Sequence, residues 1–225
     1  MTARESALAS PRLRRLAQQR PSAAAEQEEH CELCGAPIPA QHRHVLDLDT
    51  RQLLCACRPC SLLFEREAAG GGRFRLVGDR RLRLEQFELS DLTWERLRIP
   101  VDMAFLFRSS RFERVMAFYP SPLGATESRL ELSDWQQVEQ ANPVLSDMQP
   151  DVEALLVHRA HGARRYWIVP IEDPYRLVAL IRTEWRGLTG GKAVWTDIER
   201  FFDELDRHSQ TFDPIRGAPA PERSY

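Results

Sequence analysis

Five cysteines within thirty residues are the part of the sequence best suited to chemistry. Four of them form two pairs, Cys31-Glu-Leu-Cys34 and Cys57-Arg-Pro-Cys60, with 22 residues between the pairs. Two CxxC turns that converge at the end of a hairpin place four thiolates tetrahedrally, an arrangement that zinc and mononuclear iron both accept. We therefore predict a metal site at Cys31, Cys34, Cys57 and Cys60.

The number and distribution of the cysteines also indicate the cellular compartment in which the protein works. The number is odd, and the rest of the chain has no cysteine, which argues against a disulfide framework. The first twenty residues lack the apolar segment of a secretory signal, and no stretch approaches 18 apolar residues. We expect a cytoplasmic protein without a membrane span, in which the thiols stay reduced.

The same four ligands allow two metals with different roles. A four-thiolate zinc ion has no open position for water and is structural, whereas iron would make a rubredoxin-like electron carrier. Ser61 stands where rubredoxins usually have glycine, and Phe64 is the only aromatic residue between positions 30 and 66. Both features favour zinc.

Three further residues of this region leave alternatives open. Cys55 and Cys57 point the same way in a strand, so either thiol could reach the metal, although the CxxC turn favours Cys57. Cys55 is then a core residue, a spare ligand or a reactive thiol. His42 and His44 could replace a thiolate, but we expect both to be exposed surface residues.

The elements that must position these residues follow from periodicity. Alternating residues at 44–49 and 52–56 predict a β-hairpin around Thr50–Arg51, and Gly35 lets the first knuckle turn back. We expect four segments: a disordered tail at 1–29, the four-cysteine module at 30–66, an α+β domain at 73–208 after the joint Gly70–Gly72, and a flexible tail at 209–225.

The larger segment alternates strand pairs with helices. Strands are expected at 73–78, 80–85, 103–107, 114–119, 152–160 and 164–171, with a Pro/Gly loop at 119–128. Helices are expected at 90–97, at 133–141, after the N-cap Asp173, and after the capping box Thr196-x-x-Glu199. We predict an α+β fold, in which a zinc-ribbon or rubredoxin-like knuckle module precedes a mainly antiparallel sheet packed with helices.

Carboxylates outside the module offer only a weak catalytic pattern. Asp151 and Glu153 could share a strand face, and Glu127 lies in the 119–128 segment, so each is a candidate for acid–base chemistry. Residues 186–193 lack the first glycine and the Ser/Thr of a phosphate-binding loop. We interpret His158 and His161 as surface histidines, and expect no enzyme.

The charge balance argues against a generally basic nucleic-acid binder. There are 31 Lys and Arg residues against 33 Asp and Glu residues, and Lys192 is the only lysine. Such an arginine bias is typical of a GC-rich bacterial genome, so we interpret the arginine stripe at 73–83 as a solvated sheet face. A zinc-ribbon regulator that binds nucleic acid through this stripe is the alternative.

Several motifs together resemble one family. They are CELCGAPIP (31–39), HRHVLDL (42–48), CACRPCSLLF (55–64), IPVDMAFLF (99–107), YPSPLGATES (119–128), PDVEALLV (150–157) and WRGLTGGKAVW (185–195). The chain resembles the uncharacterised bacterial family DUF5947, over about residues 30–208. The resemblance implies a genetic context among accessory genes of [NiFe] hydrogenases, and no activity.

This context gives the leading interpretation of the sequence. We expect a non-catalytic accessory or maturation factor for a [NiFe] hydrogenase, with a structural zinc module and an α+β domain that docks a protein partner such as a hydrogenase subunit or a maturation protein. The alternatives are a rubredoxin-like iron electron carrier and the nucleic-acid-binding regulator.

Overall fold

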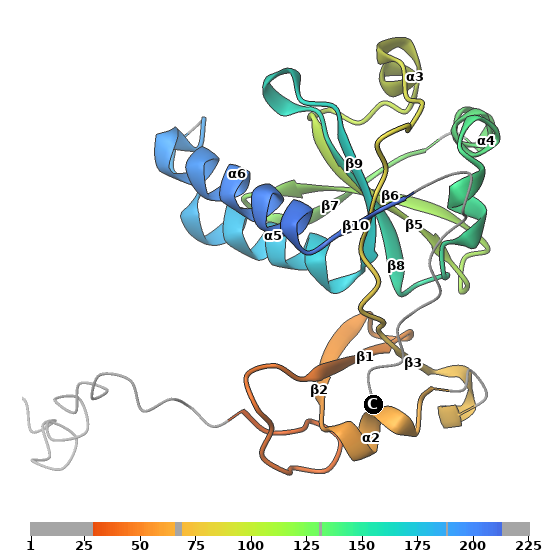
Figure 1. Ribbon diagram of the computed structural model, residues 1–225, viewed down its shortest axis with the longest axis vertical. Helices are drawn as coiled ribbons and strands as arrows, with labels where there is room; N and C mark the ends of the chain where they lie inside the picture. The colour runs from red at the N-terminus through yellow and green to blue at the C-terminus, as the bar shows by residue number, and fades with distance from the viewer. Residues whose placement is uncertain (1–28, 66–68, 131, 188, 213–225) are drawn as a thin grey trace, which may run out of the picture.

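The cysteine module is built on a small antiparallel sheet. In the computed structural model, which describes residues 29–65, 69–130, 132–187 and 189–212, the expected hairpin consists of β1 (Arg43–Asp47) and β2 (Gln52–Ala56). The chain then enters the short helix α2 (Arg58–Leu62) and later the 3-10 turn η1 (Ala69–Gly72). The module lies below the larger domain in Figure 1.

The module includes a strand that we had expected in the next domain. β3 (Phe74–Leu76) pairs antiparallel with β1, which gives the sheet order β2-β1-β3. Leu46 of β1 and Val77, which directly follows β3, are 4% and 2% exposed, and both belong to the main hydrophobic core. The small sheet is therefore packed against the large domain, and the strand expected at 73–78 completes the module.

The larger domain is an α+β fold around a mainly antiparallel sheet, as predicted. Its order is β10-β4-β9-β8-β5-β6-β7, and only the pairing of β10 with β4 is parallel. The strands are β4 (Leu82–Arg83), β5 (Met103–Ser109), β6 (Arg114–Ser121), β7 (Gly124–Ser128), β8 (Glu153–His158), β9 (Arg165–Pro170) and β10 (Gln210–Thr211).

Helices cover both faces of this sheet (Figure 1). The first face packs against α5 (Glu172–Glu184) and α6 (Gly191–Arg207), and the second against α3 (Asp91–Arg96), α4 (Leu132–Ala141) and the 3-10 turn η2 (Pro143–Asp147). A third 3-10 turn, η3 (Ala160–Gly162), joins β8 to β9. Strand residues of opposite parity supply the two cores, because successive side chains point to opposite faces.

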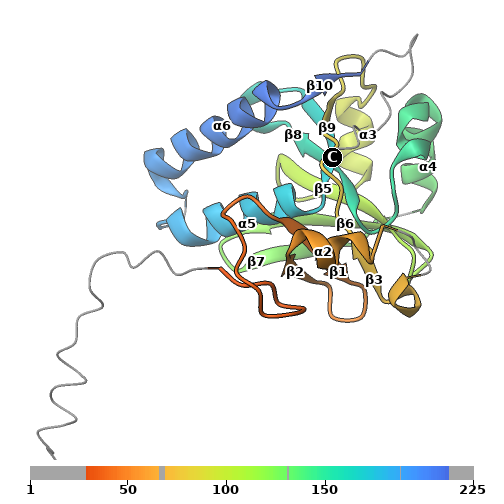
Figure 2. The same cartoon turned by 60° about the horizontal axis from the view of Figure 1, so that its bottom comes forward.

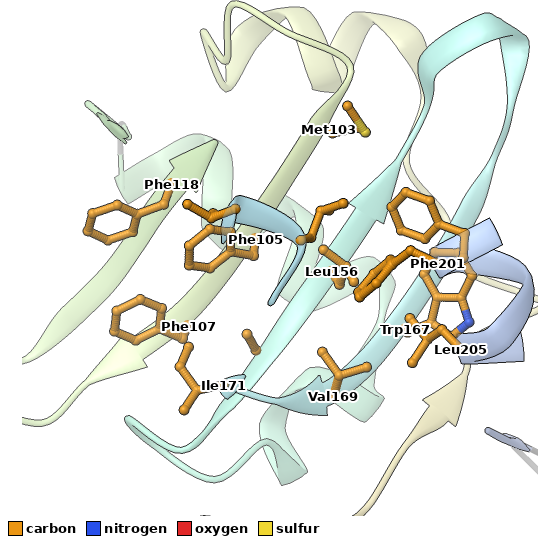
Figure 3. Packing of buried hydrophobic residues seen from close by; sticks show 14 of the residues in the cluster. Met103, Phe105, Phe107, Phe118, Leu156, Trp167, Val169, Ile171, Phe201 and Leu205 are labelled. Atoms are coloured by element: carbon orange, nitrogen blue, oxygen red, sulfur yellow. The ribbon is translucent and has the colours of Figure 1, made fainter. Parts of the chain in front are cut away.

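Aromatic residues fill the core under α5 and α6. Phe105, Phe107 and Phe118 gather on one part of the sheet in Figure 3, while Trp167 lies on the other part with Phe201 of α6. The Trp167 ring stacks on Phe202 of α6 with centroids 5.2 Å apart. Trp167 is fully buried, and its indole Nε1–H donates to Asp206 of α6 at 2.9 Å. This bond satisfies the one polar group that a buried tryptophan brings into a core.

Two segments that we expected to be irregular contain strands. The predicted loop at 119–128 is wrong, because it forms the end of β6 and the whole of β7. Pro120 is tolerated there since the pairing of β6 with β5 ends at Phe118. β10 lies in the expected C-terminal tail, while residues 1–28 and 213–225 of the two tails lie outside the described residues.

Both expected helix caps are wrong. α5 begins at Glu172 without a side-chain cap, and Asp173 instead receives an ion pair from Arg81 at 2.7 Å. α6 begins at Gly191, five residues before the expected capping box, and Gly190 takes the left-handed conformation with φ 81°. Thr196 therefore lies inside the helix, where its hydroxyl donates to the Lys192 carbonyl.

His158 is buried, which corrects our interpretation of it as a surface residue. Its side chain is 0% exposed, its Nε2 lies 3.1 Å from Glu199 Oε1, and its ring stacks on Phe202 of α6. Burial lowers the pKa of His158 below its usual range, although the nearby Glu199 carboxylate opposes this shift. The neutral ring thus fits this core better than the charged one.

The lowered pKa of His158 predicts that protonation destabilises the fold. The unfolded chain binds this proton near pH 6.5 while the folded chain resists it, so the stabilisation is present above pH 6.5 and is lost as pH falls. We expect His158→Phe to flatten the decrease in the free energy of unfolding between pH 7.5 and 5.5. Urea titrations across this range measure the effect, with the exposed His208→Phe as control.

His44 has the opposite tendency, so the comparison between variants is essential. A hydrogen bond to Glu172 raises the pKa of His44 above its usual value, although burial opposes it. Its stabilisation is present below pH 6.5 and disappears as pH rises through the folded pKa. Parallel curves for His158→Phe and the wild type would contradict the assignment to His158.

Candidate metal centre

The four cysteines of the two CxxC pairs converge at one end of the hairpin. Cys31 and Cys34 lie on the turn before β1, Cys57 directly precedes α2, and Cys60 lies within it. Their sulfur atoms all lie within 4.8 Å of one another. The structure therefore brings together the same four residues that the spacing predicts.

The sulfur spacing fits a tetrahedral metal site. Cys34 Sγ and Cys57 Sγ lie 3.7 Å apart. Metal–sulfur bonds of about 2.3 Å in a tetrahedron require sulfur atoms about 3.8 Å apart. These four thiols can hold a metal ion with little rearrangement, and four sulfur ligands leave no position for a catalytic water.

Backbone geometry explains how each pair turns. Gly35 has φ 75°, and its N–H donates to the Cys31 carbonyl at 2.7 Å, which closes the first knuckle. A residue with a side chain would be strained at this φ. The second knuckle is the start of α2, where the Ser61 N–H donates to the Cys57 carbonyl at 2.9 Å. A helical turn therefore replaces a second glycine turn.

Electrostatics within the group favour a bound cation. Burial raises the pKa of Cys31, but backbone N–H groups of Cys57, Leu33 and Cys34 outweigh burial and lower it to about 6. The Cys60 thiol donates hydrogen bonds to the Cys57 and Cys34 sulfur atoms, which raises the pKa of Cys60 to about 12. One thiolate is thus stabilised by the backbone, while full deprotonation of the group requires a metal ion.

The α2 side of the site faces outward. Cys34 is exposed, and Leu62 and Leu63 are 53% and 64% exposed. The neighbouring Phe64, by contrast, packs against Phe74 of β3 with ring centroids 5.5 Å apart. The two leucines beside Cys60 form an apolar surface that none of the described residues covers.

Cys55 does not join the four-cysteine group. β2 ends at Ala56 and the chain then enters α2, so Cys55 and Cys57 belong to different groups although only one residue separates them. Cys55 instead lies with His42 and His44. The side chain of His42 is only 6% exposed, which corrects the expectation of a surface histidine.

The carboxylates considered for catalysis do not form one site. Asp151 contacts Arg75 at 3.3 Å, Glu153 contacts Arg80 at 2.5 Å, and the exposed Glu127 contacts Arg114. The cavity that Asp151 lines measures about 20 Å³, room for about one water molecule. A substrate has no space there.

The arginine stripe is engaged in ion pairs rather than free. Its members contact carboxylates of both the module and the large domain: Arg73 with Asp47, Arg75 with Asp151, Arg80 with Glu153, Arg81 with Asp173, and Arg83 with Asp206. Paired guanidinium groups offer little net charge to a phosphate backbone. The nucleic-acid alternative therefore loses the feature on which it rested.

Comparison with known proteins gives a family without an activity. A family model described as "Family of unknown function (DUF5947)" matches residues 30–209, more than half of the chain. Neither the curated proteins nor the solved structures include a match. Across the described ranges, no helix combines the length and the apolar character that crossing a membrane requires.

Proposed function

The chain belongs to DUF5947, a family of unknown function, and we propose that it is a non-catalytic accessory or maturation factor of a [NiFe] hydrogenase. In this proposal the four-cysteine site holds structural zinc, and the protein works in the cytoplasm by docking a protein partner. The hydrogenase context comes from the resemblance of the sequence motifs. The structural role of the metal comes from the geometry of the site.

The closed four-thiolate arrangement carries the structural part of the proposal. The Cys34–Cys57 sulfur separation of 3.7 Å matches a tetrahedral edge, and the four cysteine sulfur atoms would fill all four positions around an ion. A three-stranded sheet and one five-residue helix supply little core of their own. A zinc ion can supply the missing folding free energy of such a module, about 10–16 kcal/mol in small zinc domains.

The apolar surface beside the site supports a docking role. Leu62 ends α2 and Leu63 is its C-cap, so both exposed side chains lie within three residues of Cys60, where a bound metal would fix the backbone. Exposed apolar residues on a rigid element are typical of protein interfaces. The turn between β6 and β7 presents a second candidate, because Leu123 is 95% exposed.

Affinity capture tests the docking role. The tagged full chain is to be expressed in cells that assemble a [NiFe] hydrogenase, and hydrogenase subunits or maturation proteins are to be sought among the captured proteins by mass spectrometry. We expect Leu62→Asp combined with Leu63→Asp to abolish capture while the four-cysteine site keeps its metal. Leu123→Asp is the matched control on the other surface.

The outcomes separate the parts of the proposal. If Leu123→Asp abolished capture and the Leu62→Asp, Leu63→Asp variant did not, the interface would lie at the β6–β7 turn. Capture of no hydrogenase subunit or maturation protein, together with normal hydrogenase activity after deletion of the gene, would overturn the hydrogenase role. Stoichiometric iron in the four-cysteine site would support the electron-carrier alternative instead.

A further inference from the structure

We propose that His42, His44 and Cys55 form a second metal site, distinct from the four-cysteine site, which binds a divalent transition-metal ion and leaves one coordination position open. The ligand atoms of the three side chains lie within 4.8 Å of one another. This inference does not depend on the hydrogenase role.

The register of the hairpin brings these side chains together. His44 on β1 lies directly opposite Cys55 on β2, and cross-strand neighbours have Cβ atoms about 5 Å apart. His42 precedes His44 by two residues and shares its face, with ring centroids 4.7 Å apart. The three ligands thus come from the hairpin of β1 and β2, whose strands lie side by side in Figure 2, and from the residue that precedes β1 by one position.

Both imidazole rings are oriented through their Nδ1 atoms. His42 Nδ1 lies 3.0 Å from the Pro39 carbonyl oxygen and 3.3 Å from Glu29 Oε2, and His44 Nδ1 lies 2.7 Å from Glu172 Oε2. Since these partners accept hydrogen bonds, Nδ1 carries the proton and Nε2 keeps its lone pair. This carboxylate–histidine arrangement is typical of histidines that ligate a metal.

The third ligand has a comparable outer partner. The carboxylate of Glu32 accepts a hydrogen bond from the Cys55 backbone N–H at 2.6 Å, and the Glu32 N–H donates to the Cys55 carbonyl at 2.8 Å. These two bonds fix the backbone that carries the thiol. Glu29, Glu32 and Glu172 also place negative charge around the group, which favours a cation.

The Nε2 atom of His42 provides an independent reason for a ligand. This atom is buried and has no hydrogen-bond partner, and the His42 side chain as a whole is only 6% exposed. A buried polar atom without a partner costs free energy, so such atoms are rare without a functional reason. A metal ion shared with His44 and Cys55 would use this lone pair.

The donor set indicates the class of ion. Two imidazoles and one thiolate suit Zn²⁺, Co²⁺, Ni²⁺ or Cu²⁺ and not Mg²⁺ or Ca²⁺, which prefer oxygen. In a tetrahedral site such ligand atoms lie about 3.3–3.6 Å apart. Here one ligand atom of each side chain lies within 4.8 Å of the others, so binding needs at most a small approach of the side chains. With three protein ligands, a water or an exchanging ligand fills the fourth position, which distinguishes this site from the closed one.

The site also joins the module to the large domain. Glu172 begins α5, and it reaches His44 while Arg81 lies 3.5 Å from its other oxygen. The His44 and Glu172 side chains are 27% and 22% exposed, so an ion has access from solvent. Binding or release of an ion here would therefore change contacts of both the module and the large domain.

A cobalt titration of the reduced, metal-free full chain tests the site. We expect two Co²⁺ equivalents: a first that gives the intense absorption of a four-thiolate site, and a second with the weaker bands of mixed nitrogen and sulfur ligands. Cys55→Ser and His42→Ala should weaken the second equivalent at least about 100-fold and leave the first unchanged. His161→Ala, which changes an exposed histidine outside the group, is the control.

A conservative variant outside the module distinguishes loss of the second metal site from misfolding of the module. Glu172→Gln should weaken only the second equivalent, by about 10–100-fold, because it removes an outer partner and no ligand. The first Co²⁺ band reports in every variant that the module has folded. Binding of a single equivalent by the wild type, or an unchanged second equivalent in Cys55→Ser and His42→Ala, would overturn the proposal.

Discussion

Cys57→Ser is expected to remove the metal from the four-cysteine site and to unfold the cysteine module. One ligand of four is lost, and the module depends on the metal because its own core is small. Structural zinc contributes about 10–16 kcal/mol in small zinc domains, so its loss exceeds what three short strands can replace. Hydrogen exchange should show that the amides of β1, β2 and β3 lose protection.

Cys55→Ser is the matched control for this prediction. It makes the same change two residues away, in a thiol that lies outside the four-cysteine group. This variant should retain the tightly held metal and the protection of β1 and β2. If Cys57→Ser kept the metal and the protection, or if the two variants behaved alike, the four-cysteine assignment would be wrong.

In Cys57→Ser, the loss of amide protection should be smaller in the large domain than in the cysteine module. Leu46 and Val77 link the module to the main core, so the domain loses some packing when the module unfolds. The central strands β5, β8 and β9 are covered by helices on both faces and do not depend on the cysteines. Their amides should therefore remain protected.

Glu153→Gln is expected to cost about 3–5 kcal/mol in the free energy of unfolding, as does removal of one partner from other buried ion pairs. Arg80 binds Glu153 through two nitrogens, Nε to Oε1 at 2.8 Å and Nη2 to Oε2 at 2.5 Å. The two side chains are 14% and 4% exposed, so the variant leaves a guanidinium charge largely buried. Urea unfolding of the full chain measures the change.

Glu127→Gln provides the comparison for Glu153→Gln. Glu127 also contacts an arginine, Arg114, but the two side chains are 44% and 45% exposed. Exposed pairs contribute about 0–1 kcal/mol, so this variant should be nearly as stable as the wild type. Equal losses in the two variants would show that burial does not set the strength of these pairs.

The sequence predicts the local elements and the convergence of the four cysteines well. The hairpin at β1 and β2, the convergence of Cys31, Cys34, Cys57 and Cys60, and the mainly antiparallel sheet all depend on short-range patterns that the structure confirms. The alternation of apolar and polar residues and the CxxC spacing each involve only a few neighbouring residues, so the local structure that they predict also forms in the folded chain.

The errors arise where contacts distant in sequence decide the outcome. His158 is buried because α6 covers the end of β8, and Glu199 binds His158 rather than capping a helix. The start of α6 depends on Gly190, where an added Cβ would lie 2.8 Å from Val194. Such packing leaves no signature in a window of neighbouring residues.

The group of His42, His44 and Cys55 had a usable signal that we interpreted differently. Once the turn at Thr50–Arg51 is assigned, the register places His44 opposite Cys55 and puts His42 on the same face. The partners Glu29 and Glu172 lie in other segments, so the burial and orientation of the rings required the structure.

The identity of the most tightly bound metal tests the proposed structural role most directly. Protein purified without oxygen should be treated with a mild chelator that leaves one metal equivalent, and then examined by elemental analysis and X-ray absorption. We predict zinc with four sulfur neighbours at about 2.3 Å and no visible absorption. Stoichiometric iron with a thiolate-to-iron band, or fewer than four sulfur neighbours around the metal, would contradict a structural zinc site.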